Sequence, residues 1–256
     1  MLQDLPPADA ARLALQCLDL TSLNDGDTPS DIDALCRRAQ TRFGNVAAVC
    51  VWPRFVAQAR AALPASIRVA AVANFPAGAL DAALALRDVE AIASAGGDEV
   101  DVVLPYRALM QGDSAACADF LRAVRKASGP LTLKIILESG VLVDHALIAQ
   151  ATRLALAAGA DFVKTSTGKT PASATLDAAA VMLNTIAASG LPRAGFKASG
   201  GIRSVADATA YLRLVADTLG AEALTPRRFR FGASALLNDI EAVLSGEAPA
   251  LGSSAY

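Results

Sequence analysis

Two short segments of the chain place a lysine at the end of an apolar run. Residues 162–169 read FVKTSTGK, and residues 195–201 read GFKASGG, so Lys164 and Lys197 hold the same position in the two runs. An amine attacks a carbonyl carbon only in its uncharged form, which a lysine at neutral pH rarely adopts without help from its surroundings. If the surroundings keep one of these two lysines uncharged, that lysine can form an imine with an aldehyde.

The two lysines can supply that help to each other if their runs are adjacent strands. Strands in a sheet lie about 4.8 Å apart, so the two ammonium groups would be roughly 5 Å from each other. At an effective dielectric constant of ~20 their repulsion is about 3 kcal/mol, which favours release of one proton. The alternative is that both lysines neutralise carboxylates at this place, and the pattern alone does not decide between the two.

Carboxylates also occur on the apolar runs. In residues 98–103, DEVDVV, the side chains of Glu99 and Asp101 share one face, and Asp19 lies in a similar run, residues 17–21. An inward-facing Asp101 can move protons at the carbon beside an imine, or it can serve only as a structural ion-pair partner. Lys134 is expected deeper in its strand, paired with Asp101 or Glu138, and it is given no catalytic role.

Small residues follow the last of these runs. Gly200 and Gly201 come after one run, and Gly232 and Ser234 come at the end of the next. Glycine allows backbone N–H groups to approach an anion closely, and a helix that begins there attracts negative charge. The two loops predict a phosphate site, with Gly168 and Lys169 as a third edge and Arg203 as a fourth.

The elements that must position these residues alternate along the whole chain. Apolar runs alternate with alanine- and leucine-rich helical patterns, which predicts parallel strands joined by right-handed crossovers. Eight such runs in 256 residues predict a single-domain α/β fold, a (β/α)8 TIM barrel spanning residues 1–256 with a flexible tail from about residue 247. An open doubly wound sheet is the alternative, although the GxGxxG dinucleotide motif is absent. The predicted strands are residues 17–21, 46–51, 68–73, 99–104, 131–137, 162–165, 195–198 and 229–231.

Predicted helices fill the gaps between most of these strands. Thr28 and Thr175 have the character of helix starts, and glycines lie just past several helix ends. The predicted helices are residues 83–95, 117–128, 146–158, 176–188, 205–219 and 235–244, and the terminal glycines are Gly96, Gly159, Gly190 and Gly220.

Composition excludes several classes of protein. A formal net charge of −2 argues against a nucleic-acid binder. No apolar run is long enough to cross a membrane, and the N-terminus lacks the features of a secretory signal. The spacing of the four cysteines fits neither a metal site nor a disulfide framework, which indicates reduced thiols and a cytoplasmic protein. A single histidine, His145, excludes a histidine-rich metal site and a Ser-His-Asp triad.

The segments together resemble the deoxyribose-phosphate aldolase family, in order and along nearly the whole chain. The pair KTSTGK and GFKxxGG at this separation is highly specific. The matching segments are residues 18–25 (LDLTSLND), 44–55 (GNVAAVCVWPRF), 74–76 (NFP), 98–107 (DEVDVVLPYR), 164–169 (KTSTGK), 195–203 (GFKASGGIR) and 230–234 (RFGAS).

The resemblance implies a class I aldolase without metal or cofactor, which reversibly cleaves 2-deoxy-D-ribose 5-phosphate to D-glyceraldehyde 3-phosphate and acetaldehyde. In this reading Lys164 forms the imine, Lys197 favours its neutral form and joins proton transfer, and Asp101 is the acid/base. A monomer or homodimer is implied. The other implied site residues are Asp19, Thr21, Cys50 and Lys169 around the substrate, Gly168, Gly200, Gly201, Gly232 and Ser234 around the phosphate, and Tyr256 as a proton-transfer residue in the tail.

This chain departs from the family pattern at two places. Ala235 stands where a second serine is common, which removes one hydroxyl donor near the phosphate, and Ala198-Ser199 stands where Pro-Ala is common. Two other functions remain open. One is an imine-forming barrel aldolase that uses another donor, such as dihydroxyacetone or pyruvate, and the other is a phosphosugar-binding barrel without catalysis.

Overall fold

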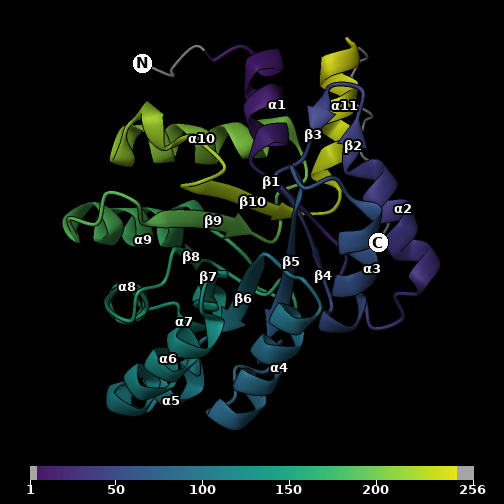
Figure 1. Cartoon of the computed structure of the whole chain (residues 1–256). Helices are drawn as coiled ribbons and strands as arrows, with labels where there is room; N and C mark the ends of the chain where they lie inside the picture. The colour runs from purple at the N-terminus through teal and green to yellow at the C-terminus, as the bar shows by residue number, and fades with distance from the viewer. Residues whose placement is uncertain (1–4, 247–256) are drawn as a thin grey trace.

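A closed barrel of parallel strands forms the centre of the molecule (Figure 1). The computed structural model describes residues 5–246, and within them the strands of the barrel follow the order β1-β10-β9-β8-β7-β6-β5-β4. Closure confirms the predicted TIM barrel and excludes the open doubly wound sheet. The barrel strands are β1 (Leu18–Thr21), β4 (Ala48–Val51), β5 (Arg68–Ala73), β6 (Glu99–Val103), β7 (Thr132–Ile136), β8 (Phe162–Lys164), β9 (Gly195–Ser199) and β10 (Phe229–Ala233).

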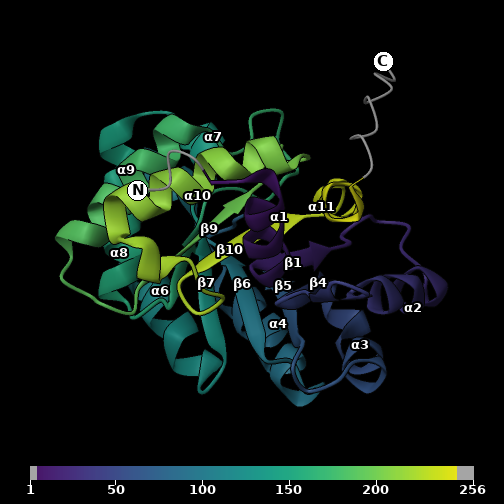
Figure 2. The same cartoon turned by 90° about the horizontal axis from the view of Figure 1, so that it is seen from above.

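Helices surround the strands, as Figures 1 and 2 show from two directions. Three of them lie before the first helix predicted from the sequence, and the short helices α5 and α7 lie in loops between predicted elements. The helices are α1 (Pro7–Gln16), α2 (Pro29–Arg38), α3 (Val56–Ala62), α4 (Ala82–Ser94), α5 (Tyr106–Met110), α6 (Ser114–Ser128), α7 (Ser139–Leu142), α8 (His145–Ala157), α9 (Leu176–Ala188), α10 (Val205–Leu219) and α11 (Leu236–Ser245), with 3-10 turns η1 (Pro53–Phe55) and η2 (Ala221–Ala223).

The helix ends follow the local sequence signals. Thr28 caps α2 through a reciprocal pair of hydrogen bonds with Asp31, and Thr175 caps α9 by accepting a hydrogen bond from the backbone N–H of Ala178. Gly96 and Gly159 follow α4 and α8 with φ angles of 83° and 87°, a backbone region that L-residues with a Cβ rarely adopt. These starts and stops are as predicted.

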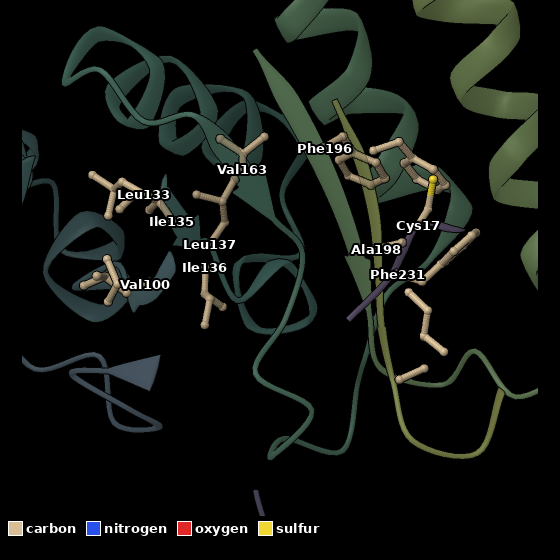
Figure 3. Packing of buried hydrophobic residues seen from close by; sticks show 14 of the residues in the cluster. Cys17, Val100, Leu133, Ile135, Ile136, Leu137, Val163, Phe196, Ala198 and Phe231 are labelled. Atoms are coloured by element: carbon tan, nitrogen blue, oxygen red, sulfur yellow. The ribbon is translucent and has the colours of Figure 1, made fainter. Parts of the chain in front are cut away.

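Alternate residues of each barrel strand face opposite sides of the sheet. One set packs against the helices in a large buried core, part of which appears in Figure 3. On β7 and β8, Ile135 and Val163 of this set are cross-strand partners, whereas the intervening Lys134 and Lys164 lie on the other face. Since the first set points to the helices, the second points into the barrel. The inward positions therefore carry the site.

The barrel interior has an apolar side and a charged side. The apolar side is a small separate cluster of Leu23, Cys50, Ala70 and Val72, which comes from β4, β5 and the segment after β1. The charged side comes from β1 and from β6 to β10, and its side chains contact one another. This division places an apolar wall opposite a set of buried charged side chains.

The structure differs from the predicted elements mainly near the N-terminal half. The strand predicted at residues 46–51 begins at Ala48 in the structure. The chain just before it forms a small hairpin of two strands, β2 (Gln40–Thr41) and β3 (Gly44–Asn45). The predicted tail from residue 247, including Tyr256, lies outside the described residues. Among residues 5–246 no helix is long and apolar enough to cross a membrane.

Candidate active site

Asp101 of β6 lies at the centre of the charged side. Its Oδ1 accepts a hydrogen bond from Lys134 Nζ at 2.8 Å, and its Oδ2 accepts from Lys164 Nζ at 2.9 Å and Lys197 Nζ at 2.8 Å. Strand register produces this arrangement, because Lys164 and Lys197 are partners on β8 and β9, and Asp101 and Lys134 are partners on β6 and β7. The structure thus brings together the two predicted lysines and the predicted aspartate.

A second layer of ion pairs holds this centre. Asp19 of β1 pairs with Lys197 and with Arg230 of β10, and Glu99 pairs with Lys134 and with Arg230. Arg230 was not predicted as part of the site. Its guanidinium links the two carboxylates, which fixes their positions relative to the lysines. The alternation of Phe229, Arg230 and Phe231 on a predicted strand was the signal for an inward arginine.

Lys134 pairs with Asp101, which is one of the two partners predicted for it. The other alternative, Glu138, is wrong, because Glu138 follows the end of β7 and accepts hydrogen bonds from the loop after β8. Its carboxylate accepts from the hydroxyls of Thr167 and Thr170, at 2.5 and 3.3 Å. Glu138 is fully buried, and it holds the loop that carries Gly168 and Lys169. Sequence reasoning did not give it this role.

The buried cluster carries more positive than negative groups. Asp19, Glu99 and Asp101 face Lys134, Lys164, Lys197 and Arg230, and none of the seven residues is more than 5% exposed. Three carboxylates against four cations leave one excess positive charge, and an uncompensated charge in a buried site is costly. The cluster is neutral when one lysine is uncharged.

Lys164 has fewer carboxylate contacts than the other cations of the cluster. Its ammonium contacts one carboxylate, Asp101, whereas Lys197 contacts both Asp101 and Asp19, and Lys134 contacts Asp101, Glu99 and, at 3.8 Å, Asp19. Among the described residues, each other cation of the cluster has at least two carboxylate partners. The Coulomb attraction that is lost when a lysine releases its proton is therefore smaller for Lys164 than for Lys134 or Lys197.

Two neighbours of Lys164 have pKa values shifted by the same cluster of charges. Burial by itself would raise the pKa of Asp101, but Lys134, Lys164 and Lys197 hold that pKa well below its usual range. Burial would lower the pKa of Lys197, but the carboxylates of Asp101 and Asp19 raise it above its ordinary value. Lys197 is thus held as a cation beside Lys164, with Asp101 between the two amines.

Asp101→Asn is expected to destabilise the fold as well as the site. It leaves the buried lysines short of one counter-charge, and breaking a buried pair in this way costs about 3–5 kcal/mol. Because folding lowers the pKa of Asp101, this loss is fully present above about pH 4, the ordinary pKa of aspartate, and shrinks as the pH falls below it. Urea unfolding of wild type and variant at several pH values measures the difference.

Asp119→Asn is the matched control for that variant. Asp119 pairs with Arg122 on the surface, where the two side chains are 70% and 65% exposed. Such pairs contribute about 0–1 kcal/mol. An Asp101→Asn protein as stable as Asp119→Asn at neutral pH would contradict the ion-pair account.

A cavity of about 320 Å³ opens at the C-terminal ends of β1, β9 and β10. Gly168, Gly200 and Gly201 have φ angles of 76°, 92° and 80°, so the loops adopt backbone turns that suit glycine. The predicted phosphate residues meet here, together with two residues predicted to contact the substrate and the proposed fourth edge. The cavity is lined among others by Gly168, Gly200, Gly201, Gly232, Ser234, Thr21, Lys169 and Arg203.

The start of α11 is arranged to receive an anion. Ala235 is the N-cap residue of α11 and lines the cavity, and it makes no side-chain capping hydrogen bond. The first N–H groups of α11 are therefore left for another acceptor. The nearby helix α10 differs, because Ser204 caps it by accepting a hydrogen bond from the N–H of Asp207. The missing hydroxyl at Ala235 thus leaves the backbone part of the anion site in place.

Thr21 and Cys50 are two further residues that were predicted to contact the substrate. Thr21 donates a hydrogen bond through Oγ1 to the backbone carbonyl of Asp19 at 2.8 Å. Cys50 is fully buried in the apolar cluster on the other side of the barrel interior, and burial, with a contribution from Asp101, raises the pKa of its thiol. Cys50 therefore forms part of the apolar wall of the barrel interior.

Comparison with known proteins shows which family the chain belongs to. A family model described as DeoC/LacD family aldolase matches residues 13–242. A deoxyribose-phosphate aldolase from Agrobacterium fabrum is 51% identical over 253 residues, which cover 98% of this chain and 97% of that protein. Aldolases are lyases, so the chain is similar throughout to an enzyme of that class.

Solved structures show the same likeness. A crystal structure from Coccidioides immitis, assigned as a deoxyribose-phosphate aldolase, is 31% identical with a TM-score of 0.79, and covers 93% of this chain and 91% of that one. A structure from Toxoplasma gondii, 24% identical with a TM-score of 0.85 and 97% and 98% coverage, shares the fold. The barrel, the lysine pair and these matches lead to one conclusion: the chain belongs to the DeoC/LacD family of aldolases.

Proposed function

We propose that the protein reversibly cleaves 2-deoxy-D-ribose 5-phosphate to D-glyceraldehyde 3-phosphate and acetaldehyde through an imine on Lys164. The observation that carries this proposal is Lys164 itself, a buried lysine with one carboxylate contact in a cluster with one excess positive charge. The cavity at the C-terminal ends of β1, β9 and β10, called the anion cavity below, suits the phosphate. The Agrobacterium fabrum relative is named as a deoxyribose-phosphate aldolase.

The first half of the reaction forms the electron sink. The neutral amine of Lys164 attacks the aldehyde carbon, and the carbinolamine loses water to give a protonated imine. The cluster then holds its excess positive charge on the imine nitrogen. This cation accepts the electron pair of the bond between C2 and C3, and the C3 hydroxyl proton must leave at the same time.

Asp101 and Lys197 are placed to move that proton. Oδ2 of Asp101 accepts hydrogen bonds from both amines, so this carboxylate can take up the hydroxyl proton through a water, and the Lys197 ammonium beside it can donate a proton when one is needed. Cleavage yields glyceraldehyde 3-phosphate and an enamine on Lys164. Protonation of the enamine carbon and hydrolysis of the imine release acetaldehyde and restore the free amine.

The anion cavity supplies binding energy away from the bond that breaks. Phosphate held there orients the sugar so that its aldehyde reaches Lys164. Lys169 and Arg203 line the cavity and add positive charge, and Ser234 adds a hydroxyl donor. The cavity therefore distinguishes the phosphorylated sugar from free deoxyribose.

Ser234→Asp is expected to raise the KM for deoxyribose 5-phosphate on the order of 100-fold, because a carboxylate about 5 Å from the phosphate adds ~3 kcal/mol of repulsion at an effective dielectric of ~20. The rate with unphosphorylated 2-deoxyribose should change little. Steady-state kinetics with both substrates make the comparison, and Ser94→Asp, on the exposed end of α4, is the matched control. Equal losses on both substrates would argue against a phosphate site here.

A direct assay separates this function from the two alternatives. Incubation with deoxyribose 5-phosphate should release acetaldehyde and glyceraldehyde 3-phosphate in equal amounts, each detected by a coupled dehydrogenase. Synthesis with glyceraldehyde 3-phosphate as acceptor should proceed with acetaldehyde as donor. Turnover only with dihydroxyacetone or pyruvate would indicate the other aldolase, and sugar-phosphate binding without products would indicate the non-catalytic barrel.

We further propose that the enzyme acts in the cytoplasm in deoxyribonucleotide catabolism, as a monomer or homodimer. The four cysteines lie buried and unpaired, which suits a reducing compartment. Light scattering of the purified protein gives the oligomeric state, and a mass above that of a dimer would overturn this part of the proposal.

A further inference from the structure

A second cavity lies at the opposite end of the barrel. Its volume is about 1150 Å³, and its lining residues precede or begin the barrel strands. Ala47 precedes β4, Arg68 begins β5, Phe162 begins β8 and Arg228 precedes β10. The proposed phosphate site lies instead at the C-terminal ends of the strands. The two cavities are therefore separate, and the reaction proposed above does not use this one.

Positive charge is concentrated in the second cavity. Its lining includes five arginines, Arg68, Arg193, Arg227, Arg228 and Arg230, and two carboxylates, Glu99 and Asp161. Five positive charges against two negative charges leave an excess of three. The whole chain has a formal net charge of −2, so this local excess opposes the charge of the molecule.

Three of these arginines have no counter-charge in the fold. Arg68 pairs with Asp98, and Arg230 pairs with Asp19 and Glu99. Within residues 5–246, Arg193, Arg227 and Arg228 form no ion pair. Arg193 and Arg227 are exposed and Arg228 is half-buried, and all three line one concave surface, which favours the binding of an anion.

One donor in this group lacks an acceptor altogether. Nε of Arg228 is buried, and no hydrogen-bond partner accepts from it in the described part of the chain. Buried donors in folded proteins are nearly always paired with protein, water or ligand atoms. The unmatched Nε therefore points to an acceptor that comes from outside the chain.

We propose that this cavity binds an oligophosphate, either as the free anion or as part of a nucleoside di- or triphosphate. Guanidinium groups form paired, charge-assisted hydrogen bonds with phosphate oxygens, and a chain of two or three phosphates matches an excess of three positive charges. A volume of about 1150 Å³ also accommodates a nucleoside. Asn45, Ser66 and Thr225 line the same space and offer amide and hydroxyl groups to a sugar or base.

Isothermal titration calorimetry of the full-length protein tests the proposal. Sodium tripolyphosphate and ATP are titrated separately, with EDTA present to remove divalent cations. Saturable binding with one oligophosphate per chain is expected with at least one of the two. Similar affinities would assign recognition to the phosphates, and much tighter binding of ATP would add the nucleoside. No saturable binding of either compound up to the millimolar range overturns the proposal.

Variants place the binding in one cavity or the other. Arg193→Gln with Arg227→Gln should weaken binding at least tenfold, and both side chains are exposed, so the fold should be unaffected. Arg37→Gln with Arg87→Gln, on exposed faces of α2 and α4, removes the same charge outside the second cavity and should leave binding within twofold. Ser66→Glu introduces an acid into the second cavity from another loop and should also weaken binding at least tenfold.

Ser234→Asp completes the set, because it blocks the cavity at the C-terminal ends of the strands. Oligophosphate binding should survive in this variant. Binding that is lost in Ser234→Asp but retained in the double arginine variant and in Ser66→Glu would assign the ligand to the active-site cavity and overturn the proposal.

Discussion

Lys164→Ala should lower kcat for deoxyribose 5-phosphate cleavage by roughly four orders of magnitude or more, since no other group can take the place of the covalent nucleophile. Binding of the substrate should persist, because the anion cavity does not include Lys164. Steady-state assays and equilibrium binding of the sugar phosphate make the two measurements. Lys126→Ala, on the exposed face of α6, is the control and should keep full activity.

Substantial activity in Lys164→Ala would contradict the assignment of the nucleophile. The geometry leaves one clear substitute, Lys197, but two carboxylates hold that amine as a cation. A variant that lost binding and turnover together, with an altered melting temperature, would show a structural role for Lys164 in the buried cluster.

Lys197→Leu is expected to lower activity by roughly two to three orders of magnitude and to move the acid limb of the pH–rate profile to higher pH. Without Lys197 the cluster contains three carboxylates and three cations, so Lys164 keeps its proton until the solution becomes more alkaline. The neutral amine is the reactive form, and the rate therefore rises only at higher pH. Initial rates between pH 5 and pH 10 define the shift.

Lys134→Leu separates charge from proton transfer. It also removes one positive charge from the cluster, so the same alkaline displacement of the profile is expected. Lys134 contacts Oδ1 of Asp101, whereas Lys164 and Lys197 share Oδ2, so the path between the two amines stays intact. The rate at the new optimum should therefore fall less in Lys134→Leu than in Lys197→Leu. Profiles unchanged in both variants would contradict the charge-balance account.

Strand positions could be predicted because buried parallel strands are short apolar runs between helical patterns. The eight barrel strands lie where the sequence placed them, to within about two residues at most ends. The small hairpin of β2 and β3 was missed, because Gln40–Thr41 and Gly44–Asn45 are polar, and tertiary position rather than composition makes them pair. Helix α1, near the N-terminus, was also missed.

The central part of the site followed from strand ends and alternation alone. Lys164, Lys197 and Asp101 had to converge once the barrel closed, whereas the same reasoning left two partners open for Lys134, Asp101 and Glu138. The outer partners could not be predicted, because which carboxylate an arginine reaches depends on side-chain length and on strands far apart in sequence. Arg230 contacts Glu99 across 131 positions of the chain, and no local pattern specifies that pair.

Borohydride trapping tests the central claim most directly. The protein is incubated with acetaldehyde and sodium borohydride at neutral pH, digested, and analysed by peptide mass spectrometry. The charge balance predicts a single ethyl group, from the reduced imine, on Lys164, and none on Lys197 or Lys134. Modification of Lys197 in preference to Lys164, or no stable adduct in an active preparation, would show that Lys164 is not the uncharged amine on which the reaction depends.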